Sequence, residues 1–410
     1  MLTNLYAYLG PYSVPVFRKL LGAALVSGIG DALIPIAFAI ESHRVEPSGW
    51  GFTLVLLSLW LGRLLGMLIV RHTRPAANPV SVMITSDIVR FSAQIGLFIW
   101  LILHADHNSE AIVTITAFSI SSGIYGLATA FIQPARFNAM AHIIPSKHRT
   151  QANSWMSIFG DTLSIVGPLV SSVIMISIGF KSVLLIDALS FLIGILMLTR
   201  IKVNQSGHTT DKIINTENEI PHINNVKLPR WINVGFMTWL FVALTIGILG
   251  TAGPTFVIDR NSSAAWAVAA ACMATGSLAG SAISLLGVIK SLSWKQLQLL
   301  ACFSLAAQIL CFLFVSVPLI VWVSGFFGSA LVTVSGIRWD TIGQSVGSDK
   351  HIHAFAVRDQ AVHTIGIPAG MLIFGVSTIL NSSAAAITIV AAVVATMGIF
   401  IATVKTPDFL

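Results

Sequence analysis

Acidic side chains inside long apolar stretches are the residues of this chain best placed to do chemistry. Asp31, Asp161 and Asp187 each lie well within such a stretch. If these stretches span a membrane, an ionisable side chain near the centre costs roughly 2.5–3.5 kcal/mol, so each acid needs a role that offsets the cost. A carboxylate that meets dry and wet surroundings in turn can take up a proton on one side and release it on the other.

Asp31 is the stronger candidate for this proton chemistry, because it lies past the middle of the first apolar stretch. Asp161 lies in a Gly-rich stretch that could bend and approach a neighbouring helix closely. It could hold a proton or a cationic substrate group, or it could bond that neighbour, and the structural role is open to Asp31 as well. Asp187 is expected to be structural. We predict Asp31 and then Asp161 as proton-coupling acids.

Charged residues near the ends of the stretches predict a network and a gate. We expect Arg63 or Arg71 to form a buried ion pair with Asp87 and Arg90, the alternative being that Arg63 binds an anion. Opposite charges at 338–340 and 358–359 could form a gate that breaks when a cavity opens, or could be plain surface pairs. The predicted network and gate consist of Arg63, Arg71, Asp87, Arg90, Arg136, Arg338, Asp340, Arg358 and Asp359.

Neutral polar side chains predict the lining of a substrate cavity. The candidates are Gln94, Gln133, Gln360 and His363. A histidine can take up and release a proton near neutral pH in general, so His363 could assist proton transfer, or it could simply pack. Together with the many Phe, Trp and Met residues, these amides suit a large amphipathic substrate better than a sugar or an inorganic ion.

Several kinds of chemistry have no matching motif. The chain has no G-x-x-x-x-G-K-[ST] loop, which argues against ATP as the energy source, and no metalloprotease spacing or activated nucleophile. We therefore expect no enzyme activity, no metal site and no cofactor. The three cysteines fall inside apolar stretches and are expected to be small buried hydrophobic residues.

The composition shows what must position these residues. Of the 410 residues, 55% are hydrophobic and only 10% are charged, whereas soluble domains carry about 25% charged residues. Soluble multidomain enzymes, disordered tails and disulfide scaffolds are excluded. The net charge of +7 is spread singly or in pairs between apolar stretches, so a nucleic-acid partner is not expected. The chain is predicted to be a polytopic membrane protein.

Twelve apolar stretches predict an all-α membrane fold of twelve transmembrane helices in two six-helix bundles. They fall at roughly 17–40, 50–70, 80–103, 111–133, 151–178, 182–200, 231–257, 264–289, 296–316, 318–340, 355–380 and 384–404. The predicted domains are an amino-terminal bundle (1–200), a polar linker (201–230) and a carboxy-terminal bundle (231–410). Most of the 23 Lys and Arg residues face one side if both termini and the linker are cytoplasmic, which predicts that orientation.

Several motifs resemble the major facilitator superfamily. Residues 66–74 resemble its G-x-L-x-D-R-x-G-R loop, although Val70 stands at the acidic position and Thr73 at the second glycine. More specific matches point to the drug/proton antiporter branch that includes macrolide and enterobactin exporters. These are Gly30-Asp31, Ser86-Asp87 with Arg90, Gln133-Pro134-Ala135-Arg136 followed by Pro145, Arg149 and Ala152-Asn153-Ser154, the antiporter motif of Gly160, Gly167 and Pro168, and Asp187 to Phe191.

This resemblance implies the major facilitator fold, with the helix of Asp31 lining the central cavity. It also implies a proton-coupled exporter of an antibiotic, a siderophore or a self-made antimicrobial peptide in a bacterial cytoplasmic membrane. Its expected partners are the small-molecule or peptide substrate, protons and the lipid bilayer, and the protein is expected to be a monomer. The alternatives are a proton- or sodium-coupled importer, a lysophospholipid flippase and a non-transporting receptor.

Overall fold

All elements in the described part of the chain are helices. The computed structural model describes residues 10–73, 76–104, 111–201, 226–288 and 291–406. The amino-terminal spans are α2 (Pro15–Val45), α3 (Trp50–His72), α4 (Pro79–Leu103), α5 (Ala111–Ile143), α6 (Arg149–Ser177) and α7 (Phe180–Leu198). The carboxy-terminal spans are α8 (Arg230–Arg260), α9 (Ser263–Leu286), α10 (Trp294–Phe314), α11 (Pro318–Gly343), α12 (Asp349–Ile379) and α13 (Ser383–Thr403). Short 3₁₀ helices, η1 (Gly10–Ser13) and η2 (Ser146–His148), precede α2 and α6.

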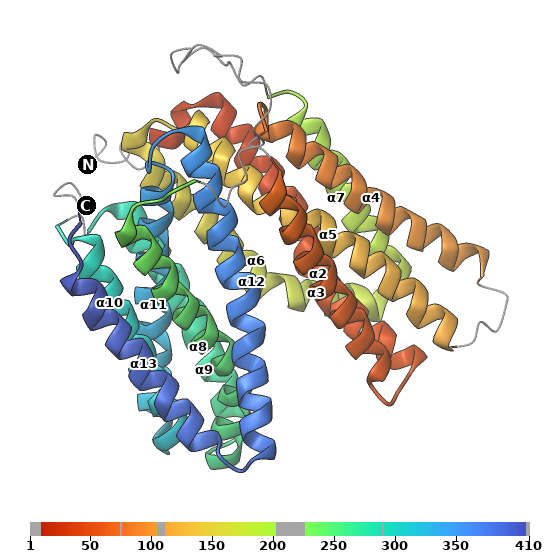
Figure 1. The fold of residues 1–410 in the computed structure, drawn as a ribbon. Coiled ribbons are helices and arrows are strands. Elements are labelled where there is room, and N and C mark those ends of the chain that lie inside the picture. Colours follow the sequence, from red (N-terminus) through yellow and green to blue (C-terminus); the bar gives the residue numbers. More distant parts are fainter. Residues whose placement is uncertain (1–9, 74–75, 105–110, 202–225, 289–290, 407–410) are drawn as a thin grey trace.

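These spans confirm the predicted all-α membrane fold, since all twelve are long and apolar enough to cross a bilayer. They form two six-helix bundles, α2–α7 and α8–α13 (Figure 1). The bundles lie close together at the end that carries the labels N and C and diverge toward the other end (Figure 1). Most of the predicted linker lies at 202–225, outside the described residues, so the predicted domain boundaries stay predictions.

Three helices are clearly longer than their apolar stretches predict, and one of them is α2, which runs to Val45 although its stretch ends near 40. The stretch 111–133 predicts a helix that ends before Pro134, whereas α5 continues through Pro134 to Ile143. Likewise α12 begins at Asp349, ahead of the predicted start at 355. The added turns of α5 and α12 carry Asn138 and His353, which meet across the two halves, whereas the added turn of α2 carries the ion pair of Glu41 and Arg44. Hydropathy detects only the apolar part of each helix.

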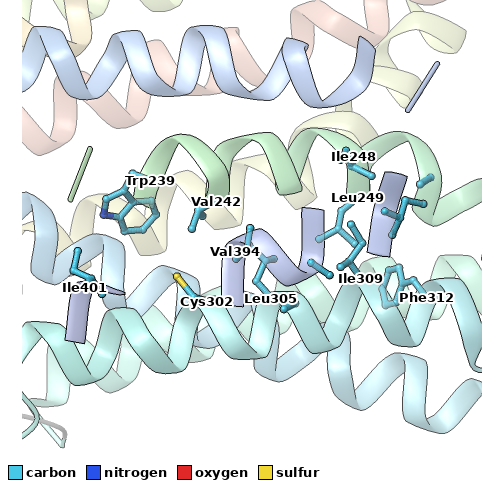
Figure 2. Packing of buried hydrophobic residues seen from close by; sticks show 14 of the residues in the cluster. Trp239, Val242, Ile248, Leu249, Cys302, Leu305, Ile309, Phe312, Val394 and Ile401 are labelled. Atoms are coloured by element: carbon cyan, nitrogen blue, oxygen red, sulfur yellow. The ribbon is translucent and has the colours of Figure 1, made fainter. Parts of the chain in front are cut away.

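The carboxy-terminal bundle has a continuous apolar core. Trp239 and Val242 on α8 pack with Leu305 and Ile309 on α10 and with Val394 on α13 (Figure 2). Cys302 is completely buried in this core, as the sequence predicts for a small hydrophobic residue. Cys272 and Cys311 are partly exposed, so the burial predicted for them is incomplete.

The amino-terminal bundle has two separate apolar clusters with charged residues between them. One cluster, around Phe17, Leu20 and Met140, lies toward the ends nearest the linker. The other, around Phe38 and Phe118, lies toward the far ends of the same helices. The layer between them contains the charged side chains of Asp31, Asp87 and Arg90, so this bundle has less apolar packing at that depth.

The two bundles are joined at the ends near the linker. Asn153 on α6 and Gln344, just after α11, exchange two amide hydrogen bonds of 3.1 and 3.0 Å. Asn138 on α5 lies 2.9 Å from Nδ1 of His353 on α12. Arg149 donates to the backbone oxygen of Gln344 (2.6 Å) and also to Ala141 within its own half (2.7 Å). We call Asn138, Arg149, Asn153, Gln344 and His353 the linker-side seal.

Thiol labelling tests which side of the membrane this seal faces. With the native cysteines replaced, a cysteine at Ser146, exposed beside the seal, should be protected from an impermeant reagent in intact cells. A matched cysteine at Ser48, exposed between α2 and α3 at the opposite end, should be labelled in the same cells. The charge distribution requires this result if the linker is cytoplasmic. The reverse labelling pattern would show that the linker and the seal face the outside of the cell.

Candidate functional site

Two cavities meet in the middle of the molecule. The main cavity, about 710 Å³, lies between the halves and is lined from α3, α5, α6, α8, α9, α11 and α12. A smaller pocket of about 250 Å³ lies within the amino-terminal bundle, between α2, α3, α4 and α5. Arg63, Thr129, Gln133 and Arg136 line both, so the pocket adjoins the cavity at these residues. The combined space is of the size that drug-like ligands occupy.

Asp31 lies in a tight polar cluster at the wall of the smaller pocket. Its two carboxylate oxygens accept hydrogen bonds of 2.8 and 3.0 Å from Arg90, and the hydroxyl of Tyr125 also donates to it. Arg90 uses its other terminal nitrogen to bond Asp87. The Asp31 side chain is 37% exposed whereas that of Arg90 is 2% exposed. Arg90 is thus a buried cation held by two acids, and only Asp31 of these two reaches the pocket.

Glycine contacts allow this cluster to form. A Cβ at Gly30 would collide with the side chains of Asp187 and Ser190, so the glycine lets α7 pack directly behind Asp31. Asp187 is completely buried there, on the face of α2 away from the pocket. Similarly, a Cβ at Gly126 on α5 would meet the backbone of Leu59 on α3. This close approach, typical of membrane helix pairs, brings Arg63 beside the pocket-lining face of α5.

The predicted pairing of Arg63 or Arg71 with Asp87 and Arg90 needs correction. Asp87 and Arg90 do bond each other, but their third partner is Asp31. Arg63 faces the two cavities and lies over the ring of Trp60, with 5.3 Å from Cζ to the ring centroid. Arg71 is exposed in the last turn of α3. Residues at a similar depth can point to different sides of their helices, so depth in the membrane does not decide which charges pair.

Asp161 links the two halves midway along α6 and α9. It accepts hydrogen bonds from Ser277 (3.0 Å) and Ser281 (3.1 Å), both on α9. Ser157, one turn away on α6, donates a longer bond of 3.4 Å to the same carboxylate. Of the two roles open to Asp161, this conformation displays the bond to a neighbouring helix, and its position on the main cavity leaves the proton or cation role available.

The carboxy-terminal half contributes an acidic wall. Asp340, Asp359 and His363 all line the main cavity, together with Gln360. Trp339 donates to Asp359 (2.7 Å), and His363 lies 3.9 Å from the same carboxylate. The four glutamine and histidine residues predicted for the substrate cavity all line one or both cavities: Gln94, Gln133, Gln360 and His363.

The predicted gate is arranged differently. Arg358 donates to the backbone oxygen of Val226, and Asp340 faces the main cavity. Arg338 is half-buried and lines neither cavity, and its Nε has no hydrogen-bond partner in the described chain. The polar contacts that join the halves on this side come instead from the linker-side seal. Opposite charges do not predict this seal, because most of its members are neutral, although Arg149 and Asn153 do belong to a motif in the sequence.

The antiporter motif lies along α6 between the cavity and α2. Gly160 lines the main cavity. A Cβ at Gly167 would meet the side chain and backbone of Ala32, so this glycine holds α6 close to the turn that carries Asp31. Pro168 lies inside α6 and removes one backbone donor there. The motif thus couples the position of α6 to that of α2.

The whole architecture is similar to that of known transport proteins. The family model described as Major Facilitator Superfamily matches residues 20–371. A bacterial homologue of the iron transporter ferroportin, in an outward-facing state, has a TM-score of 0.75 at 11% identity, covering 95% of this chain and 100% of that one. The transporter FucP in its outward conformation gives 0.63 at 13% identity, covering 97% and 100%.

The proton:xylose symporter XylE gives a TM-score of 0.64 at 12% identity, covering 94% of both chains. At these identities the likeness concerns the fold alone. No curated protein sequence matches this chain. Within the described residues, no group of three or more His, Cys, Asp or Glu side chains could hold a metal ion.

Proposed function

Because the family model covers most of its length, the chain belongs to the Major Facilitator Superfamily, and we propose that it is a proton-coupled secondary exporter. It would expel an amphipathic organic compound, such as an antibiotic, a siderophore or a self-made antimicrobial peptide, across a bacterial cytoplasmic membrane in exchange for protons. The observation that carries the proposal is Asp31. It is a membrane-embedded carboxylate at a cavity wall, held by a buried arginine and a tyrosine.

The proton step follows from the bonding of Asp31. Protonation removes its charge and weakens its pairing with Arg90, which keeps Asp87 as a partner. The bonded groups come from α2, α4 and α5, so loading a proton changes how three helices of one half are held together. Such a change can bias the equilibrium between two arrangements of the halves.

The transport step is alternating access. The halves are sealed on the linker side, and opening the cavity there requires the seal to separate and the bundles to close at their far ends. If the linker is cytoplasmic, the conformation described here is open to the outside. Substrate would enter from the cytoplasm in the opposite conformation and leave in this one.

Proteoliposomes with imposed pH gradients test the proposal. The probes are a macrolide, a catecholate siderophore and an amphipathic peptide, each offered separately. An acidic interior should drive uptake of at least one probe into the vesicles, and a proton ionophore should abolish it. The sign of this effect does not depend on the orientation of insertion. Uptake driven by an alkaline interior would identify a symporter, and no gradient-dependent uptake of any probe would contradict proton coupling.

A further inference from the structure

Two arginines at the junction of the cavities have no acidic partner. In the described part of the chain, neither Arg63 nor Arg136 forms an ion pair, and Nε of each is buried without a hydrogen-bond partner. A guanidinium at membrane depth is costly and normally pairs with an acid or with backbone oxygens. Two guanidiniums that face the same space without an acidic partner are the arrangement expected where a ligand supplies negative charge.

The nearby acids form no ion pair with either of these two arginines in the described part of the chain. Asp31 and Asp87 both form their ion pairs with Arg90, and neither lies within ion-pair distance of Arg63 or Arg136. Asp187 is completely buried behind Gly30 and does not line the pocket. Three arginines, Arg63, Arg90 and Arg136, thus face two acids, Asp31 and Asp87, which leaves one surplus positive charge at the pocket.

The rest of the pocket is apolar, and its polarity changes along its length. On α3, the pocket-lining residues Phe52, Val55, Leu56 and Leu59 are followed at the same helical spacing by Arg63. On α2, which runs in the opposite direction to α3, the charged residue Asp31 comes first and the apolar residues Ile34, Pro35 and Phe38 come after it. Because α2 and α3 are antiparallel neighbours, both helices place their charge toward the linker side and their apolar residues toward the far side.

We propose that this pocket binds an anionic amphiphile. A phosphate or carboxylate head lies between Arg63 and Arg136, with Thr129 and Gln133 as neutral hydrogen-bonding groups beside it. A single apolar tail lies along the stripe from Leu59 to Phe52. The assignment rests on the proposed function, because it names the substrate class of that cavity. A cationic amphiphile would meet two like charges, and a sugar would leave the apolar end unfilled.

Equilibrium binding tests the assignment without any pH gradient. The probe is octyl phosphate, titrated by calorimetry into the full chain in nanodiscs of zwitterionic lipid. It should bind at least about tenfold more tightly than octanol, octylamine or inorganic phosphate, because only octyl phosphate offers both the charge and the tail. Arg63→Gln and Arg136→Gln should each weaken its binding by at least about tenfold, and Arg63→Lys should retain part of it.

The matched control is Arg260→Gln. Arg260 also lies over an aromatic ring, that of Phe256, but it is exposed at the end of α8 and lines neither cavity. Its substitution should leave octyl phosphate binding unchanged. Equal binding of octylamine, equal binding of inorganic phosphate, or unchanged binding in both Arg63→Gln and Arg136→Gln would overturn the assignment.

The proton-coupled exporter and the anionic substrate class can each be contradicted without contradicting the other. If a macrolide is driven by protons but octyl phosphate does not bind, the anionic substrate class is wrong and the exporter stands. If octyl phosphate binds with the predicted charge dependence but no probe responds to a pH gradient, the exporter is wrong and the anion site stands.

Discussion

Asp31→Asn should eliminate proton-driven accumulation of substrate while leaving a folded protein that still exchanges substrate. Each pH unit across the membrane supplies about 1.4 kcal/mol per proton, equivalent to a tenfold concentration ratio. With a gradient of about two units and one proton per substrate, the wild-type chain should concentrate its substrate about a hundredfold. Asparagine keeps the shape and can accept a hydrogen bond from Tyr125, but it cannot take up a proton, so the variant should reach only the external concentration.

The structure explains why this variant should fold. Arg90 is the buried member of the pair and retains Asp87 when Asp31 loses its charge, and the Asp31 side chain is already 37% exposed to the pocket. The matched control is Asp259→Asn, an exposed acid at the end of α8 that lines neither cavity, which should behave as wild type. Hundredfold accumulation by Asp31→Asn would move the coupling role to another acid, with Asp161 as the next candidate.

Locking the linker-side seal should stop transport completely. With the native cysteines replaced, cysteines at Asn138 and His353, whose side chains lie 2.9 Å apart, can be joined by a short bifunctional thiol reagent that is cleaved by reduction. The joined protein cannot separate its halves on the linker side, so substrate cannot enter from there. Transport should fall to the leak of empty vesicles and return after reduction.

A second pair of cysteines controls for the effect of replacing the His353 side chain. Val70 on α3 packs with Ala354 and Val357 on α12 in a small apolar cluster that also joins the halves. Cysteines at Val70 and Val357 leave the polar seal intact and should give the same reversible block. Single-cysteine variants treated with the same reagent should transport normally. Full transport by either joined pair would mean that the seal does not open during the cycle.

Much of the fold could be predicted from the sequence, because a membrane imposes simple rules on it. Spans must be apolar over about 20 residues, so hydropathy alone located all twelve helices. The largest errors lie at the added turns of α2, α5 and α12, where the sequence becomes more polar at one end of the helix. Hydropathy cannot separate a polar turn packed against protein from a loop in water.

The sequence identifies many of the residues of the candidate site, but it does not identify which of them bond each other. Asp31, Asp87 and Arg90 were recognised as charges at membrane depth, yet the structure pairs Arg90 with Asp31 and leaves Arg63 facing the cavity. Tyr125 was missed because a tyrosine in an apolar stretch carries no sign that its hydroxyl reaches an acid. Partners depend on helix rotation and on close approaches such as that at Gly126, which depend on tertiary packing.

The most direct test of proton-coupled export measures proton movement driven by the substrate alone. Proteoliposomes containing a trapped pH-sensitive dye start with equal pH on both sides, and the best probe from the gradient experiments is added outside. As substrate enters, an antiporter must release protons from the interior, so the account predicts that the lumen becomes alkaline in the wild-type chain and does not in Asp31→Asn. An acidified lumen, or entry of substrate with no change of pH, would contradict it.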